Sequence, residues 1–231
     1  MNLPATPRAV LFDAYGTLFD VYSVSALAEE LFPRFGERLA ALWRDKQIEY
    51  TRLVSMSDPS GARYRPFWEL TRAGLRYAAL RFGLTLTPES EGRLMEQYLH
   101  LAAFPENRGV LESLAARGIR AGVLSNGDPG MLGAVVRNAG FADLLNPVLS
   151  VDPTRRFKTD PATYALGVQA LGVSASEILF VSSNCWDVVG ATWFGYTAFW
   201  VNRFGLPLEQ LDTPPAHTGS GLQDVLHCFR T

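Results

Sequence analysis

The residues of this sequence that could do chemistry begin with an aspartate that closes a short apolar run. Residues 9–12, Ala-Val-Leu-Phe, have the length and composition of a strand buried on both faces, and Asp13 follows them directly. Open α/β sheets bind their ligands outside the carboxyl ends of the strands, which is where this carboxylate would stand. Burial makes the charge of a carboxylate costly and raises its pKa unless a cation lies nearby. Asp13 is therefore a candidate site residue that needs a cation, the alternative being a turn or helix-cap aspartate.

Polar residues follow three separate strand-like runs, at residues 13–17, 125–126 and 182–187. The carboxyl ends of parallel strands meet at one edge of a sheet, so these three segments would converge there. Lys158 lies just ahead of a helical pattern and is a candidate for the cation that Asp13 requires. Each segment alone is also typical of a turn, a helix cap or a surface charge. Their succession at strand ends favours one common site.

The elements that must position these residues alternate between strands and helices in the second half of the chain. This alternation predicts an α/β fold with a doubly wound, mostly parallel sheet. Residues 23–100 contain only helical patterns, so they are interpreted as an inserted helical module between residues 1–22 and residues 101–231. Beyond the first strand, strands are expected at 119–124, 147–151, 177–181 and 197–201, and helices at 107–117, 128–140, 160–172, 187–194 and 222–229.

Within the insert, residues 36–54 predict a long amphipathic helix. Arg44 lies next to the apolar stripe of this helix rather than opposite to it. Further helices are expected from 23 to 35, from 67 to 82 and from 88 to 101. The apolar stripe of the long helix would consist of Leu39, Leu42, Trp43, Ile48 and Leu53.

Composition excludes several classes of protein. The 231 residues are 48% hydrophobic and 19% charged with a net charge of −2, which indicates a folded core and lacks the basic surface of a nucleic-acid binder. No run is long enough to span a bilayer, so no membrane partner is expected. Two cysteines, Cys185 and Cys228, are too few for a disulfide framework and lack metal-ligand spacing with the three histidines. A cytoplasmic protein without a metal or another cofactor is expected.

Four short segments resemble the motifs of the haloacid dehalogenase superfamily: DAYGTLFD at 13–20, LSNGD at 124–128, FKTDP at 157–161 and SSNCWD at 182–187. Within that superfamily the chain is most similar to the L-2-haloacid dehalogenases, on WRDKQIEY, RYRPF and SSNCWD. The resemblance covers nearly the whole length. It implies a Rossmann-type core at residues 1–22 and 101–231, with residues 23–100 as the helical cap.

The sequence departs from the phosphatases of this superfamily at positions that carry their chemistry. Phosphatases have a second aspartate in the first motif as a general acid, and this chain has Tyr15 there. They also have acidic magnesium ligands in the last motif, where this chain has Ser182, Ser183 and Asn184 before a single Asp187. Halide leaves without protonation, so these replacements suit dehalogenation and disfavour phosphoryl transfer.

The resemblance also implies roles for individual residues. Asp13 would be the nucleophile that forms an ester with the substrate, Lys158 would keep it ionised, and Asp187 would orient Lys158 and help activate water. The remaining roles fall into groups. Thr17 and Ser182 would hydrogen-bond the Asp13 or Lys158 head groups, and Ser125 and Asn126 would hold the substrate carboxylate. Arg44 and Asn184 would receive the halide, and Tyr164 would position Arg44 or the substrate. The walls of the pocket would be formed by Tyr15, Ile48, Phe67 and Trp186.

The function implied by the resemblance is hydrolytic dehalogenation of short L-2-haloacids to 2-hydroxyacids of opposite configuration. The expected partners are the 2-haloacid and halide, and a homodimer is expected from the family and the apolar cap helices. Two alternatives remain, a phosphatase of the same superfamily and a non-enzymatic binding protein on the same scaffold. Loss of Asp13 or Lys158 would favour the binding protein, and neither is lost.

Overall fold

The protein is described by a computed structural model, which covers residues 7–58 and 60–229. Its centre is a six-stranded sheet in the order β3-β2-β1-β4-β5-β6, with every neighbouring pair parallel. This confirms the expected α/β fold with a parallel, doubly wound sheet. The strands are β1 (Ala9–Phe12), β2 (Arg120–Ser125), β3 (Val148–Ser150), β4 (Ile178–Ser182), β5 (Thr197–Val201) and β6 (His217–Gly219).

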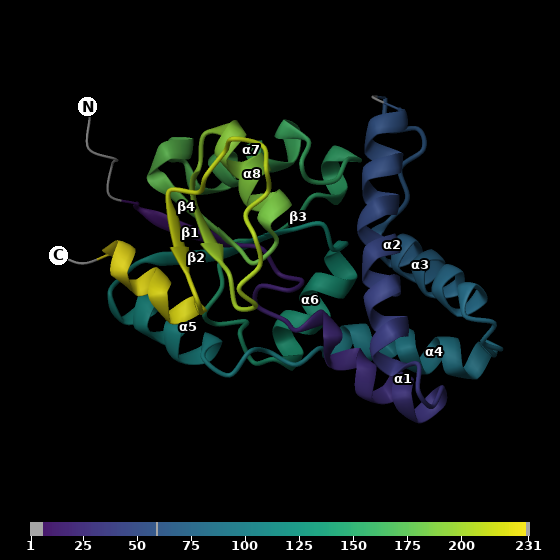
Figure 1. The fold of residues 1–231 in the computed structure, drawn as a ribbon. Helices are drawn as coiled ribbons and strands as arrows, with labels where there is room; N and C mark the ends of the chain where they lie inside the picture. The colour runs from purple at the N-terminus through teal and green to yellow at the C-terminus, as the bar shows by residue number, and fades with distance from the viewer. Residues whose placement is uncertain (1–6, 59, 230–231) are drawn as a thin grey trace.

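Helices cover both faces of the sheet, and four more lie beyond one end of it (Figure 1). α7 (Pro161–Leu171) and α8 (Cys185–Phe194) pack on one face, while α5 (Asn107–Ala116) and the C-terminal 3₁₀ helix (Leu222–Phe229) cover the other. α6 (Pro129–Asn138) packs beside β3. The four helices beyond the sheet are α1 (Ser25–Leu31), α2 (Gly36–Ser57), α3 (Phe67–Arg81) and α4 (Pro88–Gln97).

The central strand β1 sets the position of everything that follows it. It pairs with β2 and with β4 in register, so Phe12 stands beside Val123 and Val181. All four residues of β1 are buried, as expected for a strand covered by helices on both faces. The residues that follow the three strands therefore emerge side by side at one edge, which is the convergence that the sequence predicts.

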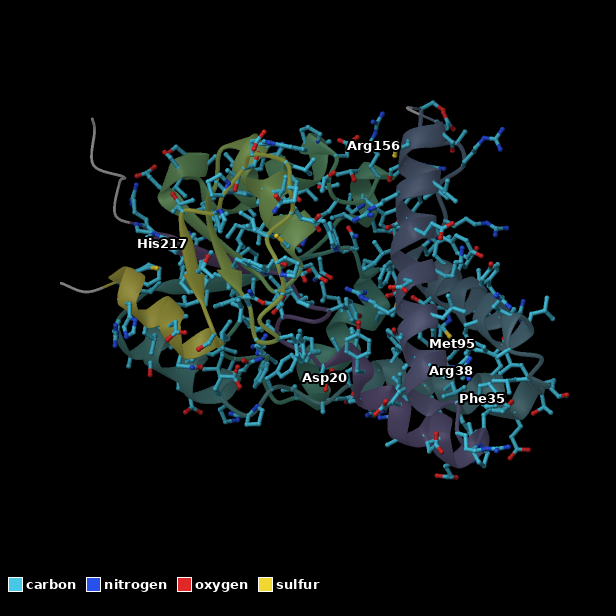
Figure 2. All side chains as sticks on the ribbon, viewed as in Figure 1. Asp20, Phe35, Arg38, Met95, Arg156 and His217 are labelled. Atoms are coloured by element: carbon cyan, nitrogen blue, oxygen red, sulfur yellow. The ribbon has the colours of Figure 1, made fainter. Side chains whose placement is uncertain are left out.

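The chain leaves the sheet for the four helices and returns at nearly the same place. The Asp20 N–H donates to the Ala102 carbonyl at 2.8 Å, and Asp20 lies between the sheet and the helices (Figure 2). Side chains then connect the two parts farther along. The carboxylate of Asp128 accepts from the N–H of Met131 at 3.1 Å and from the N–H of Trp68 at 3.0 Å, so it caps α6 and also holds the first turn of α3.

The structure differs from the sequence expectations at four places. The edge strand β6 was not expected, because its residues are largely exposed and lack apolar alternation. The last helix is a 3₁₀ helix, and α8 begins at Cys185, two residues before the expected start. Leu53 is 56% exposed, because the buried face of α2 includes the polar residues Arg44, Gln47 and Thr51 instead. No helix in residues 7–58 and 60–229 is long and apolar enough to cross a membrane.

A glycine on α7 allows this helix to approach β1 closely. A Cβ at Gly167 would collide with the Leu11 side chain and with the Tyr196 hydroxyl, whereas a Cβ at Gly109 on α5 would meet nothing within 4 Å. We expect Gly167→Ala to lower the free energy of unfolding by about 1–3 kcal/mol through overpacking. The control, Gly109→Ala, should raise it by about 0.5–1 kcal/mol, because alanine is the better helix former. Urea denaturation measures both values, and equal effects would contradict the packing of α7 on β1.

Candidate active site

A lysine lies between two carboxylates at the edge of the sheet where β1 and β4 end. Lys158 Nζ is 3.1 Å from Asp13 Oδ1 and 2.8 Å from Asp187 Oδ2. Asp13 is 5% exposed, Lys158 2% and Asp187 0%. Asp13 follows β1, Asp187 lies in the first turn of α8, and Lys158 lies in the loop before α7. The structure thus brings together the three charged residues that the sequence singled out.

Both oxygens of the Asp13 carboxylate have fixed partners. Lys158 binds Oδ1, while Thr17 Oγ1 donates to Oδ2 at 3.1 Å and Asn184 Nδ2 donates to the same atom at 2.8 Å. Thr17 Oγ1 also accepts from the Ser183 N–H at 2.8 Å, which ties the loop after β1 to the loop after β4. Such contacts hold a carboxylate in one orientation and favour its charged form.

The charges of Asp187 and Lys158 depend on each other. Burial raises the pKa of Asp187 to about 6, against the opposing effect of Lys158. Burial alone would lower the pKa of Lys158, but Asp13 and Asp187 outweigh it, so the pKa of the ammonium is raised. Lys158 therefore stays charged at neutral pH and is the cation that the buried carboxylates require.

Tyr164 holds Asp187 rather than Arg44 or an open pocket. Its hydroxyl donates to Asp187 Oδ1 at 2.7 Å, and the side chain is fully buried. Tyr164 was expected to position Arg44 or the substrate; the structure places its hydroxyl on Asp187, where α7 packs against α8. Burial, followed by the charge of Asp187, raises the pKa of Tyr164 far above its usual value, so the hydroxyl remains a donor.

Arg44 reaches the site from α2. It is 6% exposed, and its Nη2 lies 3.0 Å from the Tyr15 carbonyl and 3.4 Å from Asn184 Oδ1. Arg44, Asn184, Ile48 and Trp186 line one cavity of about 510 Å³, so four of the expected site residues share it. The remaining residues that line this cavity are Tyr22, Asp45, Glu49, Arg52 and Glu209.

Two aromatic side chains lie farther inside. The Tyr15 and Phe67 rings are both buried, with centroids 5.5 Å apart. The Tyr15 hydroxyl is buried without a hydrogen-bond partner among the described residues. Burial, followed by the charge of Asp128, raises the pKa of Tyr15 well above its usual value, so the phenol is neutral. These rings form a dry contact between the loop after β1 and the first turn of α3.

The polar residues at the ends of β2 and β4 bond to the backbone. Ser125 Oγ accepts from the Gly127 N–H at 3.1 Å, and Asn126 Oδ1 accepts from the Lys158 N–H at 2.9 Å. Ser182 Oγ accepts from the Asn184 N–H at 3.1 Å, in place of the expected bond to the Asp13 or Lys158 head group. The side-chain oxygens of these residues thus shape the loops in which the charged residues stand.

Sequence reasoning missed two residues that support the site. Arg203 follows β5 and donates to Ser183 Oγ at 2.7 Å and to the Thr17 carbonyl at 3.2 Å. Its place after a strand end was the same signal that marked Asp13, so it could have been found. Gln47 accepts from Arg44 Nη1 at 2.6 Å, and its spacing one turn after Arg44 was a weaker signal.

The described residues offer no cluster that resembles a metal centre. Within residues 7–58 and 60–229, no group of three or more His, Cys, Asp or Glu side chains is arranged to hold a metal ion. The position between Asp13 and Asp187 belongs to the Lys158 ammonium.

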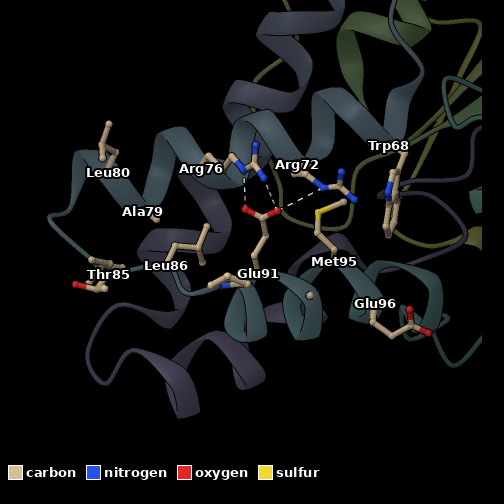
Figure 3. A pocket seen from close by; sticks show the side chains of 13 residues that line it. Trp68, Arg72, Arg76, Ala79, Leu80, Thr85, Leu86, Glu91, Met95 and Glu96 are labelled. Carbon is tan, nitrogen blue, oxygen red and sulfur yellow. Dashed lines mark hydrogen bonds and ion pairs between the residues drawn. The ribbon is translucent and has the colours of Figure 1, made fainter.

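A second cavity lies away from these residues, between α3 and α4 (Figure 3). Its volume is about 780 Å³, and Glu91 pairs with Arg76 and Arg72 across one side of it. Trp68 and Met95 also line it (Figure 3). None of the residues that line this cavity belongs to the Asp13 cluster, so its larger volume does not mark the reactive centre.

Comparison with known proteins gives this arrangement a family. A model of haloacid dehalogenase-like hydrolases matches residues 7–195. An (S)-2-haloacid dehalogenase of Pseudomonas sp. (strain YL) is 42% identical over 224 residues, which are 97% of this chain and 95% of the relative. The chain belongs to the haloacid dehalogenase-like hydrolases. The resemblance drawn from its four motifs is thereby confirmed.

Solved structures of haloacid dehalogenase-like hydrolases share the fold along the whole chain. The crystal structure of an L-2-haloacid dehalogenase is 55% identical with a TM-score of 0.95, covering 96% of this chain and 98% of that one. An L-2-haloacid dehalogenase from Xanthobacter autotrophicus with chloropropionic acid covalently bound is 36% identical with a TM-score of 0.89, covering 96% of this chain and 97% of that one.

The contact between Tyr164 and Asp187 predicts a measurable titration. Carbon-13 NMR of labelled aspartate carboxyls should show Asp187 titrating near pH 6. Burial raises its pKa by more than Lys158 and Tyr164, which donate to it, lower it. Tyr164→Phe removes a hydrogen bond to the charged form and should move this titration to higher pH. Tyr64→Phe is the matched control, because Tyr64 donates to a different aspartate, Asp152, at 2.6 Å. An Asp187 titration that stays in place or moves to lower pH in Tyr164→Phe would contradict the assignment.

Proposed function

We propose that this protein is an (S)-2-haloacid dehalogenase that replaces the halogen of a short 2-haloacid by hydroxyl with inversion. The observation that carries the proposal is a buried carboxylate, Asp13, which Lys158 contacts at 3.1 Å. Asn184 connects it to the buried guanidinium of Arg44, because its amide donates to Asp13 and accepts from Arg44. A displacement reaction needs a nucleophile and a place for the departing anion, and these side chains supply both. The relatives described above support the same activity.

In the first step, Asp13 attacks the carbon that bears the halogen. A carboxylate oxygen forms the new C–O bond from the side opposite to the halogen, and the C–X electron pair leaves with the halide. No proton is needed, because halide is a stable leaving group. Lys158 keeps Asp13 ionised, and Thr17 and Asn184 hold its plane. The neutral rings of Tyr15 and Phe67 keep water away, which makes the carboxylate more nucleophilic.

In the second step, water cleaves the ester at the carbonyl carbon of Asp13. The water gives one proton to Asp187 as its oxygen adds to the carbonyl carbon. The ester C–O bond to the substrate then breaks, the departing alkoxide takes the proton from Asp187 to become the 2-hydroxyacid, and Asp13 returns to the carboxylate as the second proton of the water passes to solvent. Asp187 suits this base role, because burial raises its pKa to about 6, nearer to neutral pH than that of an ordinary aspartate. Tyr164 holds Asp187 in place for this transfer.

Two anionic groups of the substrate need different partners. The halide would be received by Arg44 and Asn184, with Ile48 and Trp186 on the walls of the same cavity. The carboxylate would be held by the loop of Ser125 and Asn126, through backbone N–H groups that precede the N-terminus of α6.

Domain organisation and assembly belong to the same proposal. We assign residues 23–100 as a cap and residues 1–22 and 101–231 as the core, which is supported by the contact of Asp20 with Ala102 at the crossing point. We also propose a cytoplasmic homodimer. Exposed large apolar side chains on α2 and α3 support the pairing, namely Leu53, Met56, Tyr77 and Leu80. Sedimentation equilibrium should give twice the chain mass, and a monomer at all concentrations would contradict it.

The phosphatase alternative is disfavoured by two positions. The buried phenol of Tyr15 stands where an acid for an alkoxide leaving group would be needed, and its raised pKa makes it a poor proton donor. Asn184 and Ser183 stand where acidic ligands would be needed, and Lys158 occupies the space between the two carboxylates.

Halide release tests the function directly. The purified protein should release halide from (S)-2-chloropropionate and not from the R enantiomer, and should do so equally in excess EDTA. Hydrolysis of a phosphate monoester that depends on Mg²⁺, without halide release, would support the phosphatase alternative instead.

An isotope experiment then separates a nucleophilic Asp13 from a general base. A single turnover with excess enzyme in heavy-oxygen water should place the label in the peptide that contains Asp13, because water attacks the ester carbonyl. The product hydroxyl should come from the original, unlabelled carboxylate. Label in the product with an unlabelled Asp13 peptide would mean that Asp13 only activates water. Asp13→Asn should be inactive on either route, so it serves as the blank.

A further inference from the structure

The buried guanidinium of Arg44 has only neutral partners. Its nitrogens donate to the side-chain oxygens of Gln47 and Asn184 and to the Tyr15 carbonyl. Within residues 7–58 and 60–229, no carboxylate forms an ion pair with it. Buried charges in proteins are usually paired with an opposite charge, so an uncompensated one is a costly feature.

Nearby phenols do not supply the missing negative charge. Burial raises the pKa of Tyr98 to about 12 and raises that of Tyr15 further, so both are neutral at physiological pH. Asp13 shares Asn184 with Arg44, and its charge is met by Lys158. The other carboxylates that line the Arg44 cavity, Asp45, Glu49 and Glu209, are exposed to solvent, which screens their charges. The guanidinium of Arg44 therefore has no buried counter-charge of its own among the described residues and can bind an anion that enters the cavity it lines.

Gln47 is held by a chain of hydrogen bonds that has one direction. The Thr71 hydroxyl donates to the Phe67 carbonyl at 2.8 Å, so its single proton is used there. The Thr71 oxygen can then only accept from Gln47 Nε2, which lies 2.6 Å away. This fixes the amide with its NH₂ toward Thr71 and its carbonyl oxygen toward Arg44 Nη1, at 2.6 Å.

Close packing of α2 on α3 keeps this chain in place. A Cβ at Gly74 would lie 3.2 Å from the Trp43 carbonyl and 3.3 Å from the Gln47 nitrogen, so the two helices touch at backbone distance. Trp43 Nε1 donates to the Thr71 carbonyl at 2.7 Å on the same side. Gln47 itself is fully buried, and water cannot replace its contacts.

We propose that Gln47 is a positioning residue that directs Arg44 at the departing halide while leaving its charge uncompensated. The proposal rests on the proposed dehalogenase function. An amide oxygen orients the guanidinium as a carboxylate would, but it adds no negative charge. A glutamate at this place would pair with Arg44 and lower its attraction for halide.

The test compares Gln47→Glu with the wild-type protein at constant ionic strength. The inhibition constant of bromide should rise about tenfold, the effect expected when one charge-assisted contact is lost. In single-turnover experiments, halide release should slow while hydrolysis of the ester keeps its rate, because Asp187 and Lys158 are untouched. The bromide-dependent rise in melting temperature should also shrink, which reports binding without turnover.

Matched variants exclude trivial causes. Gln169→Glu adds the same charge at an exposed position on α7 and should change nothing. Thr71→Ser keeps the hydroxyl and should match wild type, whereas Thr71→Val removes the acceptor of Gln47 and should weaken bromide inhibition. If Gln47→Glu does not fold, the bromide inhibition constants of Thr71→Val and Thr71→Ser are compared instead.

The outcomes separate this inference from the proposed function. A wild-type protein that releases no halide from any 2-haloacid would refute the function. An active wild type whose bromide inhibition is unchanged in folded Gln47→Glu, or in Thr71→Val, would overturn the role of Gln47 and leave the function standing. Equal slowing of both steps, with bromide inhibition unchanged, would show that Gln47 is only structural.

Discussion

The structure depends on one buried ammonium between two buried carboxylates. Lys158 contacts both Asp13 and Asp187, and all three side chains are almost fully removed from solvent. Breaking such a buried pair by removing one partner costs roughly 3–5 kcal/mol, so the cluster constrains every segment that carries a member. The cluster alone carries one net negative charge, and Arg44 brings one positive charge close to it. α2 therefore places a guanidinium that has no ion pair among the described residues next to the charged cluster of the core.

Much of the fold and the position of the charged cluster could be predicted from the sequence, because both follow from local rules. Alternating strands and helices predict the parallel sheet, and the buried strand before Asp13 predicts the edge where its strands end. Two helix starts were also predictable, because Asp128 and Asp160 cap them. Asp13 needed a cation for physical reasons, and Lys158 supplies it. The strand β6 was missed because an exposed, polar edge strand has no hydrophobic period to detect.

Contacts between side chains far apart in sequence could not be predicted from local patterns. Tyr164 was expected near Arg44 or the substrate, but the packing of α7 against α8 brings it to Asp187. Asn126 was expected at the substrate, but its side-chain oxygen accepts from the N–H of Lys158, 32 residues along the chain. Ser182 was expected at a head group, but it accepts from the N–H of Asn184 in its own loop. In each case the residue type indicated a polar contact, and only the fold decides its partner.

The clearest conflict between local pattern and structure lies on α2. An apolar stripe through Leu53 was expected, yet the face packed on α3 and the core includes Arg44, Gln47 and Thr51. A helix that buries such residues gives up apolar packing, which is unfavourable for stability alone. The hydrogen bond that Gln47 donates to Thr71 and the one that it accepts from Arg44 offset part of that cost, but the guanidinium still has no ion pair among the described residues. Such a position makes physical sense where an anion is received, because the missing charge is supplied by the ligand each time it binds.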